Sequence, residues 1–251
     1  MKFLCLILLS LVISVNIYSR ELGETEITAD DGIEVFQDEK YYILKKNVKI
    51  LADNFTLLGD LIKISFIKDL YDIQLIDAKG NVEFNSKTHN LKATGTSMIF
   101  ILEDQEILIE GINSVLITQN SEMFSNGKIN VNNLDNTFII KGPKSSLKND
   151  NIVIKGRYID GKFSANSEIN QLTVEDENIA YVDTNNTEMY ANKINYNKTN
   201  SLIELEKNVR IISKGEEITG DYATINMNNN SYKIKSKDSK KVKVIISNNN
   251  E

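Results

Sequence analysis

Four kinds of side chain are nearly missing from this 251-residue chain, which has no tryptophan and one residue each of cysteine, histidine and proline. Cys5 lies in the apolar segment at the start, so the rest of the chain can form neither a disulfide framework nor a thiolate metal site. His89 lies in a polar turn, and a zinc site built on one histidine would need carboxylates for nearly all its ligands. A lone histidine in such a turn is more often an inert surface residue than a catalytic one. The chain after the apolar segment also has no cysteine that could act as a nucleophile. We therefore expect a protein that is not an enzyme, with no cofactor and no metal.

The 35 acidic residues leave one enzyme class open, because glycoside hydrolysis needs only two carboxylates. Most of these acids alternate along predicted strands or lie in turns, where solvation accounts for them. Asp60 and Asp221 recur at equivalent positions, but each follows a glycine, and the Gly-Asp pair is typical of a turn. The formal charge of −6 also argues against nucleic-acid binding, which needs a basic footprint.

The first residues are typical of a secretory signal. Lys2 precedes an almost unbroken apolar run that reaches Tyr18, and Ser19 follows at a plausible cleavage point. The run is shorter than the roughly 20 residues that usually span a bilayer. We expect residues 1–19 to be a cleaved signal peptide, and a retained membrane anchor is the alternative.

A long-range repeat is the strongest pattern in the chain. Residues 33–73 and 194–234 align without a gap at a separation of 161 positions, with 11 of 41 positions identical. The segment from Lys46 to Ile50 returns as residues 207–211, and Gly59-Asp60 returns as Gly220-Asp221. Such self-similarity predicts stacked structural units, with function spread along the surface of the stack.

Alternation of apolar and polar residues predicts that these units are β-strands. Ile203, Leu205, Val209 and Ile211 share one parity, and turn signals separate such segments. No segment after the signal shows a convincing helical stripe. We expect an all-β chain of about fourteen to sixteen strands, in hairpin units of roughly thirty residues, forming one elongated domain over 20–251. Five glycines are expected to begin short strands at this spacing: Gly59, Gly95, Gly127, Gly161 and Gly220.

Two middle segments, 98–102 and 107–109, are apolar at every position. Such strands are usually covered on both faces. Either they lie at the centre of a sandwich, which we favour, or one of their faces meets a bound apolar ligand.

The two ends of the predicted stack differ in charge. Residues 21–39 hold eight acids, whereas residues 233–243 hold six lysines. These charges either protect exposed edge strands from aggregation or join complementary ends by strand addition.

Several short motifs resemble the OstA-like domain of LptA, LptC and the N-terminal part of LptD. They are Ile27-Thr28-Ala29-Asp30, Lys46-Asn47-Val48, Gly59-Asp60 and Gly80-Asn81-Val82. The family pattern has a glycine at position 46 and an alanine at position 59, so two of the motifs depart from it. The clearest copies cover 27–84 and 190–246, and the middle fits only as degenerate units.

The resemblance implies an elongated, open β-jelly roll of stacked antiparallel hairpins, whose apolar groove carries lipopolysaccharide across the periplasm. It implies a non-catalytic periplasmic carrier or bridge whose partners are lipopolysaccharide or a related envelope lipid and other Lpt-type proteins joined end to end, with self-association possible. Two alternatives stay open: an inner-membrane-anchored LptC-like component, and an extracytoplasmic β-solenoid that binds or cleaves polysaccharide. The candidate groove residues are Val48, Ile50, Ile62, Ile64, Phe66, Val82, Phe84, Val209, Ile211, Ile225 and Val244.

Overall fold

A computed structural model describes residues 24–68, 72–88, 90–150, 152–184, 187–229, 231–237 and 241–246. The predicted signal segment and His89 lie outside these ranges. The described residues form 20 strands and no helix, which confirms the all-β class. The strands are β1 (Glu26–Thr28), β2 (Ile33–Phe36), β3 (Tyr41–Leu51), β4 (Phe55–Phe66), β5 (Ile73–Ser86), β6 (Leu91–Ile101), β7 (Glu106–Glu110), β8 (Ser114–Ile117), β9 (Ser121–Ser125), β10 (Lys128–Asn132), β11 (Thr137–Lys141), β12 (Ser146–Asn149), β13 (Ile152–Lys155), β14 (Tyr158–Phe163), β15 (Ile169–Thr184), β16 (Thr187–Asn197), β17 (Leu202–Ser213), β18 (Glu216–Asn226), β19 (Ser231–Lys235) and β20 (Lys243–Ile246).

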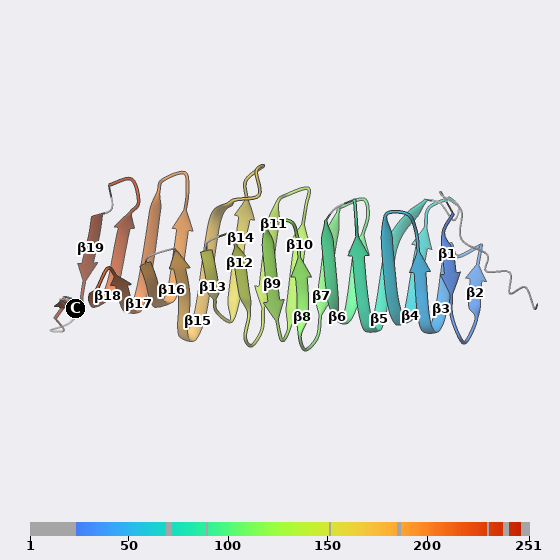
Figure 1. Ribbon diagram of the computed structural model, residues 1–251, viewed down its shortest axis with the longest axis horizontal. Coiled ribbons are helices and arrows are strands. Elements are labelled where there is room, and N and C mark those ends of the chain that lie inside the picture. The colour runs from blue at the N-terminus through green and yellow to red at the C-terminus, as the bar shows by residue number, and fades with distance from the viewer. Residues whose placement is uncertain are drawn as a thin grey trace, which may run out of the picture.

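All described pairings are antiparallel, and the sheet is folded along its length into two facing leaves. Leaf A contains β1, β8, β9, β12, β13 and β20, and leaf B contains β2, β7, β10, β11, β14 and β19. The eight long strands, β3–β6 and β15–β18, pass from one leaf to the other at a break in their register. Figure 1 shows the resulting elongated stack, with β1 and β2 at one end and β19 near the other.

The repeat unit is one hairpin that runs from leaf B to leaf A and back. Its first strands begin at residues 41, 73, 106, 137, 169 and 202, giving spacings of 32, 33, 31, 32 and 33 residues. This confirms the predicted unit of roughly thirty residues, and the 161-residue repeat joins the first unit to the sixth. The expected strand count was too low, because the two middle units break each pass into two short strands.

The line along which the leaves meet, here called the seam, accounts for the repeated Lys-Asn and Gly-Asp motifs. Lys46 and Asn47 have φ values of 69° and 48°, and their counterparts Lys207 and Asn208 have 63° and 52°. Asparagine tolerates this left-handed conformation better than most residues, so the chain can turn there from one leaf into the other.

Gly59, Gly95 and Gly220 lie inside strands at the seam, not at strand starts as predicted, whereas Gly127 comes directly before β10, as predicted. A Cβ on Gly95 would lie 2.6 Å from the side chain of Ile109, and one on Gly220 would lie 2.6 Å from that of Ile234. Glycine is therefore needed where leaf B closes against leaf A. The prediction for Gly161 also fails, since it lies inside β14, away from the seam.

Each Asp of the Gly-Asp pairs makes a hydrogen bond at the seam. The Asp60 carboxylate accepts a bond from Asn81 Nδ2 at 2.9 Å, and the Asp221 carboxylate accepts one from the backbone N–H of Lys237 at 2.9 Å. The sequence favoured a turn at each Gly-Asp pair, but both pairs lie inside strands, β4 and β18.

The middle units cross the seam through tight glycine and serine corners. Gly142 has a φ of 137°, and a Cβ there would lie 2.9 Å from the Cα of Gly127. Ser145 Oγ donates to the Gly142 carbonyl at 2.8 Å, and Ser125 and Ser145 share a buried hydrogen bond of 2.9 Å. Pro143 lies in this corner, outside any strand, as predicted.

Cross-strand register aligns the inward side chains into continuous apolar rows. In leaf B one row crosses the sheet without a polar member: Leu44, Ile62, Ala78, Met98, Ile109, Ile129, Ile140, Ile159, Val174, Ile194, Leu205, Ala223 and Ile234. Leaf A has a matching row: Ile50, Leu57, Phe84, Ala93, Leu116, Met123, Leu147, Ile154, Val182, Met189, Ile211, Ile218 and Val244. Cross-strand neighbours of this kind are the stabilising unit of a sheet. Apart from Ile218, Ile234 and Val244, the members of the two rows are buried in one core, and Ile234 packs against it.

The strands that are apolar on both faces are not covered on both sides. Met98 and Ile109 point into the core, whereas Ile99 and Leu108 are half-buried on the outer face of leaf B. Within the described ranges no further layer of chain covers that face. Its half-burial comes from neighbouring side chains on the same leaf.

Candidate functional site

The interior between the leaves holds ten of the eleven predicted groove residues. All ten are 6% exposed or less, and they belong to a single hydrophobic core or lie at its edge. Val244 is different, at 53% exposed. It pairs with Ile218, which pairs with Ile211, so register places it on the inner face of leaf A, but β20 is the last strand of that leaf in the described chain and leaves it open.

An apolar cavity of about 290 Å³ lies between the leaves on the side opposite the seam. Here the strand ends of leaf A face those of leaf B, so the interior reaches solvent. Phe55, Phe84 and Leu91 contribute from leaf A. The leaf B wall includes Ile73, Ile76, Phe100, Leu102 and Ile107.

Aromatic rings link the two walls of this cavity. The ring centroids of Phe84 and Phe100, which belong to opposite leaves, are 5.9 Å apart, and those of Phe55 and Phe84 are 6.0 Å apart. Tilted pairs at such distances are favourable arrangements. Eight of the twelve residues that line the cavity are apolar, and the polar ones are Asn54, Ser86, Gln105 and Asn133. The site therefore suits an apolar chain whose polar end stays in water.

Of the residues that line this cavity, only Phe84 is among the groove residues predicted from the sequence. Phe100, Leu102 and Ile107 occur in the segments that are apolar on both faces, for which contact with a ligand was the less favoured interpretation. Phe55 and Ile73 were missed. Both follow the pattern of inward-facing residues. Phe55 is two residues before the inward residue Leu57, and Ile73 lies cross-strand from the inward residue Phe66.

A second apolar space lies further along the same open side. It measures about 40 Å³ and includes Val182 and Thr184 from leaf A and Leu172, Tyr196 and Ile203 from leaf B. A cavity of that size holds about one water molecule. The interior in this half of the stack is therefore almost closed.

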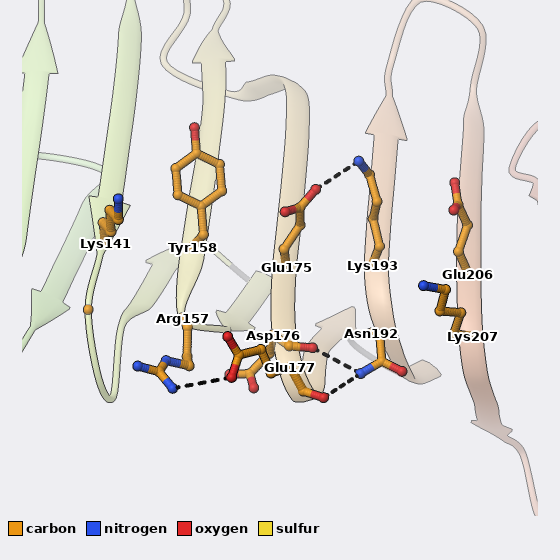
Figure 2. Close-up of a pocket in the computed structure, with 11 residues that line it drawn as sticks. Lys141, Arg157, Tyr158, Glu175, Asp176, Glu177, Asn192, Lys193, Glu206 and Lys207 are labelled. Atoms are coloured by element: carbon orange, nitrogen blue, oxygen red, sulfur yellow. Dashed lines mark hydrogen bonds and ion pairs between the residues drawn. The ribbon is translucent and has the colours of Figure 1, made fainter.

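A larger hollow of about 750 Å³ lies near the seam on the outer face of leaf B, and it is polar. A cross-strand row lines it: Lys141, Tyr158, Glu175, Lys193 and Glu206. Figure 2 shows these side chains beside the irregular segment 176–179 of β15.

Two ion pairs join four of the eight charged side chains that line this outer hollow. Lys193 Nζ lies 2.7 Å from Glu175 Oε1, and the hydrogen bond raises the pKa of Lys193. Arg157 lies 3.8 Å from Glu177, and Asn192 Nδ2 faces the carbonyl oxygens of residues 176–178 at 2.9–3.0 Å (Figure 2).

The ends of the stack expose apolar side chains beside opposite charges. At the first end, Ile33 and Val35 of β2 are 46% and 49% exposed, next to acids such as Glu34. At the other end, Ile246 of β20 is 68% exposed, and Lys243 begins the same strand. In the described part of the chain, β1, β2, β19 and β20 each pair along one side only, so both ends present open strands.

Two kinds of feature are absent from the described ranges. No helix there is long and apolar enough to cross a membrane. No group of three or more histidine, cysteine, aspartate or glutamate side chains gathers there in a way that could hold a metal ion.

Comparison with known proteins gives one family. The family model described as "LptA/(LptD N-terminal domain) LPS transport protein" matches residues 131–231, which run from β10 to the start of β19. The match includes residues 131–189, the later part of the middle region that looked degenerate in sequence. It also contains residues 194–231 of the second repeat copy, whose first copy begins at residue 33. No curated protein matches the chain.

Among solved structures, one that matches is a crystal structure of LptH from Pseudomonas aeruginosa, described as the LptA homologous periplasmic component of the lipopolysaccharide transport device. The match has 9% sequence identity and covers 89% of this chain and 95% of that chain, with a TM-score of 0.22.

Proposed function

We propose that this chain, whose residues 131–231 belong to the lipopolysaccharide-transport family of LptA and the LptD N-terminal domain, is a non-catalytic carrier of lipopolysaccharide. The apolar cavity on the open side shields acyl chains, while the saccharide stays in water. The observation that carries this proposal is the placement of an apolar cavity at the mouth of a continuous apolar interior.

The size of the cavity fits part of an acyl chain. A volume of 290 Å³ corresponds to about ten groups of the size of a water molecule or a methylene. At about 0.8 kcal/mol for each methylene removed from water, burial gives at most about 8 kcal/mol. The loss of translational and rotational freedom and the ordering of the chain and protein offset much of this gain, so the cavity by itself holds a lipid only weakly and reversibly.

Crosslinking tests this proposal directly. A photo-reactive amino acid at Gln105, on the rim of the cavity, should capture lipopolysaccharide, because its side chain faces the acyl chain. The same probe at Lys92, which is exposed and next to the cavity residue Leu91, should capture little, because alternation points it to the outer face. Equal yields at both positions in folded protein would contradict an internal lipid site.

The open ends support a bridge made of several chains. We propose that the acidic first end of one chain adds to the lysine-rich last end of another chain or of a related Lpt-type protein. Sedimentation should then show assemblies that shorten as salt rises, because the Debye length falls from about 10 Å at 0.1 M to about 3 Å at 1 M. If the length of the assemblies does not change with salt concentration, these charges do not hold the chains together.

Export is the remaining part of the proposal. Removal of residues 1–19 would release a single elongated domain, 20–251, into the periplasm, whereas retention would give an anchored LptC-like component. The mass of the native protein decides between them, since only cleavage removes the mass of the leader.

The outer hollow favours a second candidate, saccharide binding, because it gathers Tyr158, Glu175 and Glu206 in one concave surface of about 750 Å³. Oligosaccharides should then raise the melting temperature, and Glu206→Gln should reduce that increase. If no oligosaccharide of the envelope raises the melting temperature, saccharide binding is refuted.

A further inference from the structure

The open side of the molecule is closed midway by one asparagine. Asn149 ends β12 in leaf A and is 2% exposed. Its Nδ2 donates to Ser121 Oγ at 2.7 Å and to the Asn120 carbonyl at 3.0 Å, both on the same leaf. It also reaches across the opening to the carbonyl oxygen of Ser167, at 3.3 Å, in the connection between β14 and β15 of leaf B.

The connection that Asn149 contacts is an ordered turn, residues 164–168. The backbone N–H of Ser164 donates to the Glu168 carbonyl at 2.8 Å, and the N–H of Ser167 donates to the Ser164 carbonyl at 2.9 Å. Lys198 forms an ion pair with Glu168 and ties the turn to the next hairpin. The turn therefore presents the Ser167 carbonyl to Asn149 in a fixed position.

Large side chains fill the interior near this contact. Phe138 is 1% exposed, and its ring centroid is 4.5 Å from that of Phe163, the residue just before the turn. The 290 Å³ cavity involves β4–β7, and the 40 Å³ cavity involves β13 and β15–β17. Strands β9, β12 and β14 lie between these regions (Figure 1), so Asn149 separates the two cavities.

The geometry of the contact favours reversible opening. An amide NH₂ group has two donors, and Asn149 faces three acceptors, of which the one on the opposite leaf is the most distant. When the leaves separate, the two bonds within leaf A can persist. Only the longest of the three is lost, so opening does not disrupt either sheet.

We propose that Asn149 and the turn 164–168 form a latch that divides the apolar interior into a loading compartment, the larger cavity, and a closed compartment beyond it. This inference rests on the proposed carrier function. An acyl chain loads beside Phe84 and Phe100, and it advances along the stack only when the latch opens.

A covalent lock tests the latch. In the full chain carrying Cys5→Ser, cysteines replacing Asn149 and Ser167 are joined by a short, reducible bifunctional thiol reagent. Photo-reactive residues at Gln105 and Met227, which line the larger and the smaller cavity, report capture of purified lipopolysaccharide in separate samples. Reduction of the lock provides the control on the same protein.

The expected result is capture at position 105 with or without the lock, and a loss of at least about tenfold at position 227 while the lock is closed, because only the open state is competent there. Reduction should restore capture at 227. Unchanged capture at 227 in locked protein would overturn the latch and leave the carrier function standing. No capture at either position in unlocked, folded protein would overturn the carrier function and the latch with it.

A substitution gives the opposite perturbation. Asn149→Ala removes the contact across the opening and should speed the appearance of crosslinks at position 227. The matched control is Asn130→Ala, which removes an amide bonded to Glu106 on the outer face of leaf B and should not change that rate. A rate that rises equally in both variants would refute a specific role for Asn149.

Discussion

Filling the larger cavity should weaken acyl-chain binding without unfolding the protein. Leu102 lies at the end of leaf B, lines the cavity and is only partly buried. Leu102→Trp adds a ring in space that is empty and open to solvent. The substitution should therefore avoid the overpacking that destabilises closed cores.

The magnitude follows from the length of chain that the ring displaces. If the indole occupies the place of roughly three methylene groups, at about 0.8 kcal/mol each, binding weakens by about 2.4 kcal/mol. This corresponds to a dissociation constant about 50-fold higher. The matched control is Ile101→Trp, since Ile101 is the preceding residue and its side chain points to the outer face of leaf B.

The assay is displacement of a fluorescent fatty acid by a medium-chain fatty acid, with thermal melting to verify folding. Leu102→Trp should show the large increase in dissociation constant and Ile101→Trp almost none. Equal affinities in the two folded variants, or a loss confined to Ile101→Trp, would refute the assignment of the cavity as the acyl-chain site.

Three further perturbations test the fold around the site. Ile140→Ala empties a fully buried position and should lower the free energy of unfolding, measured in urea, by about 2–5 kcal/mol. The control Ile139→Ala, at a position 37% exposed, should lower it far less. Gly142→Ala introduces a Cβ at a φ of 137°, where glycine is strongly preferred, and should lower stability by more than about 1 kcal/mol in the same assay; a neutral result would show that the corner relaxes. The hydrogen bond from Lys198 lowers the pKa of Glu168, so its stabilisation is present above the unfolded value, about 4.3, and is lost as pH falls through the lower folded value. The melting-temperature difference between the native chain and Glu168→Gln should therefore shrink on acidification, and a pH-independent difference would contradict this linkage.

The local pattern was sufficient to predict much of the architecture. Alternation at Ile203, Leu205, Val209 and Ile211 predicted strands because side chains in a strand point to opposite faces in turn. The 161-residue repeat predicted a stack, and the structure resolves it into steps of 31–33 residues. Gly95 and Gly220 were wrongly placed at strand starts, because the clashes that require glycine there come from Ile109 and Ile234 on the other leaf.

The sequence by itself determined the strand class, the period of the stack and which side chains face inward, because these depend on neighbours along one strand. Only the tertiary structure decided where the interior is open. Phe55, Phe100 and Leu102 surround a cavity because the ends of strands from two leaves meet there, and Asn149 closes the opening because a turn about twenty residues later in the chain comes to face it. Val244 follows the inward pattern yet is exposed, since burial depends on whether another strand covers it. Alternation specifies the face of a residue, whereas packing between leaves decides what lies opposite that face.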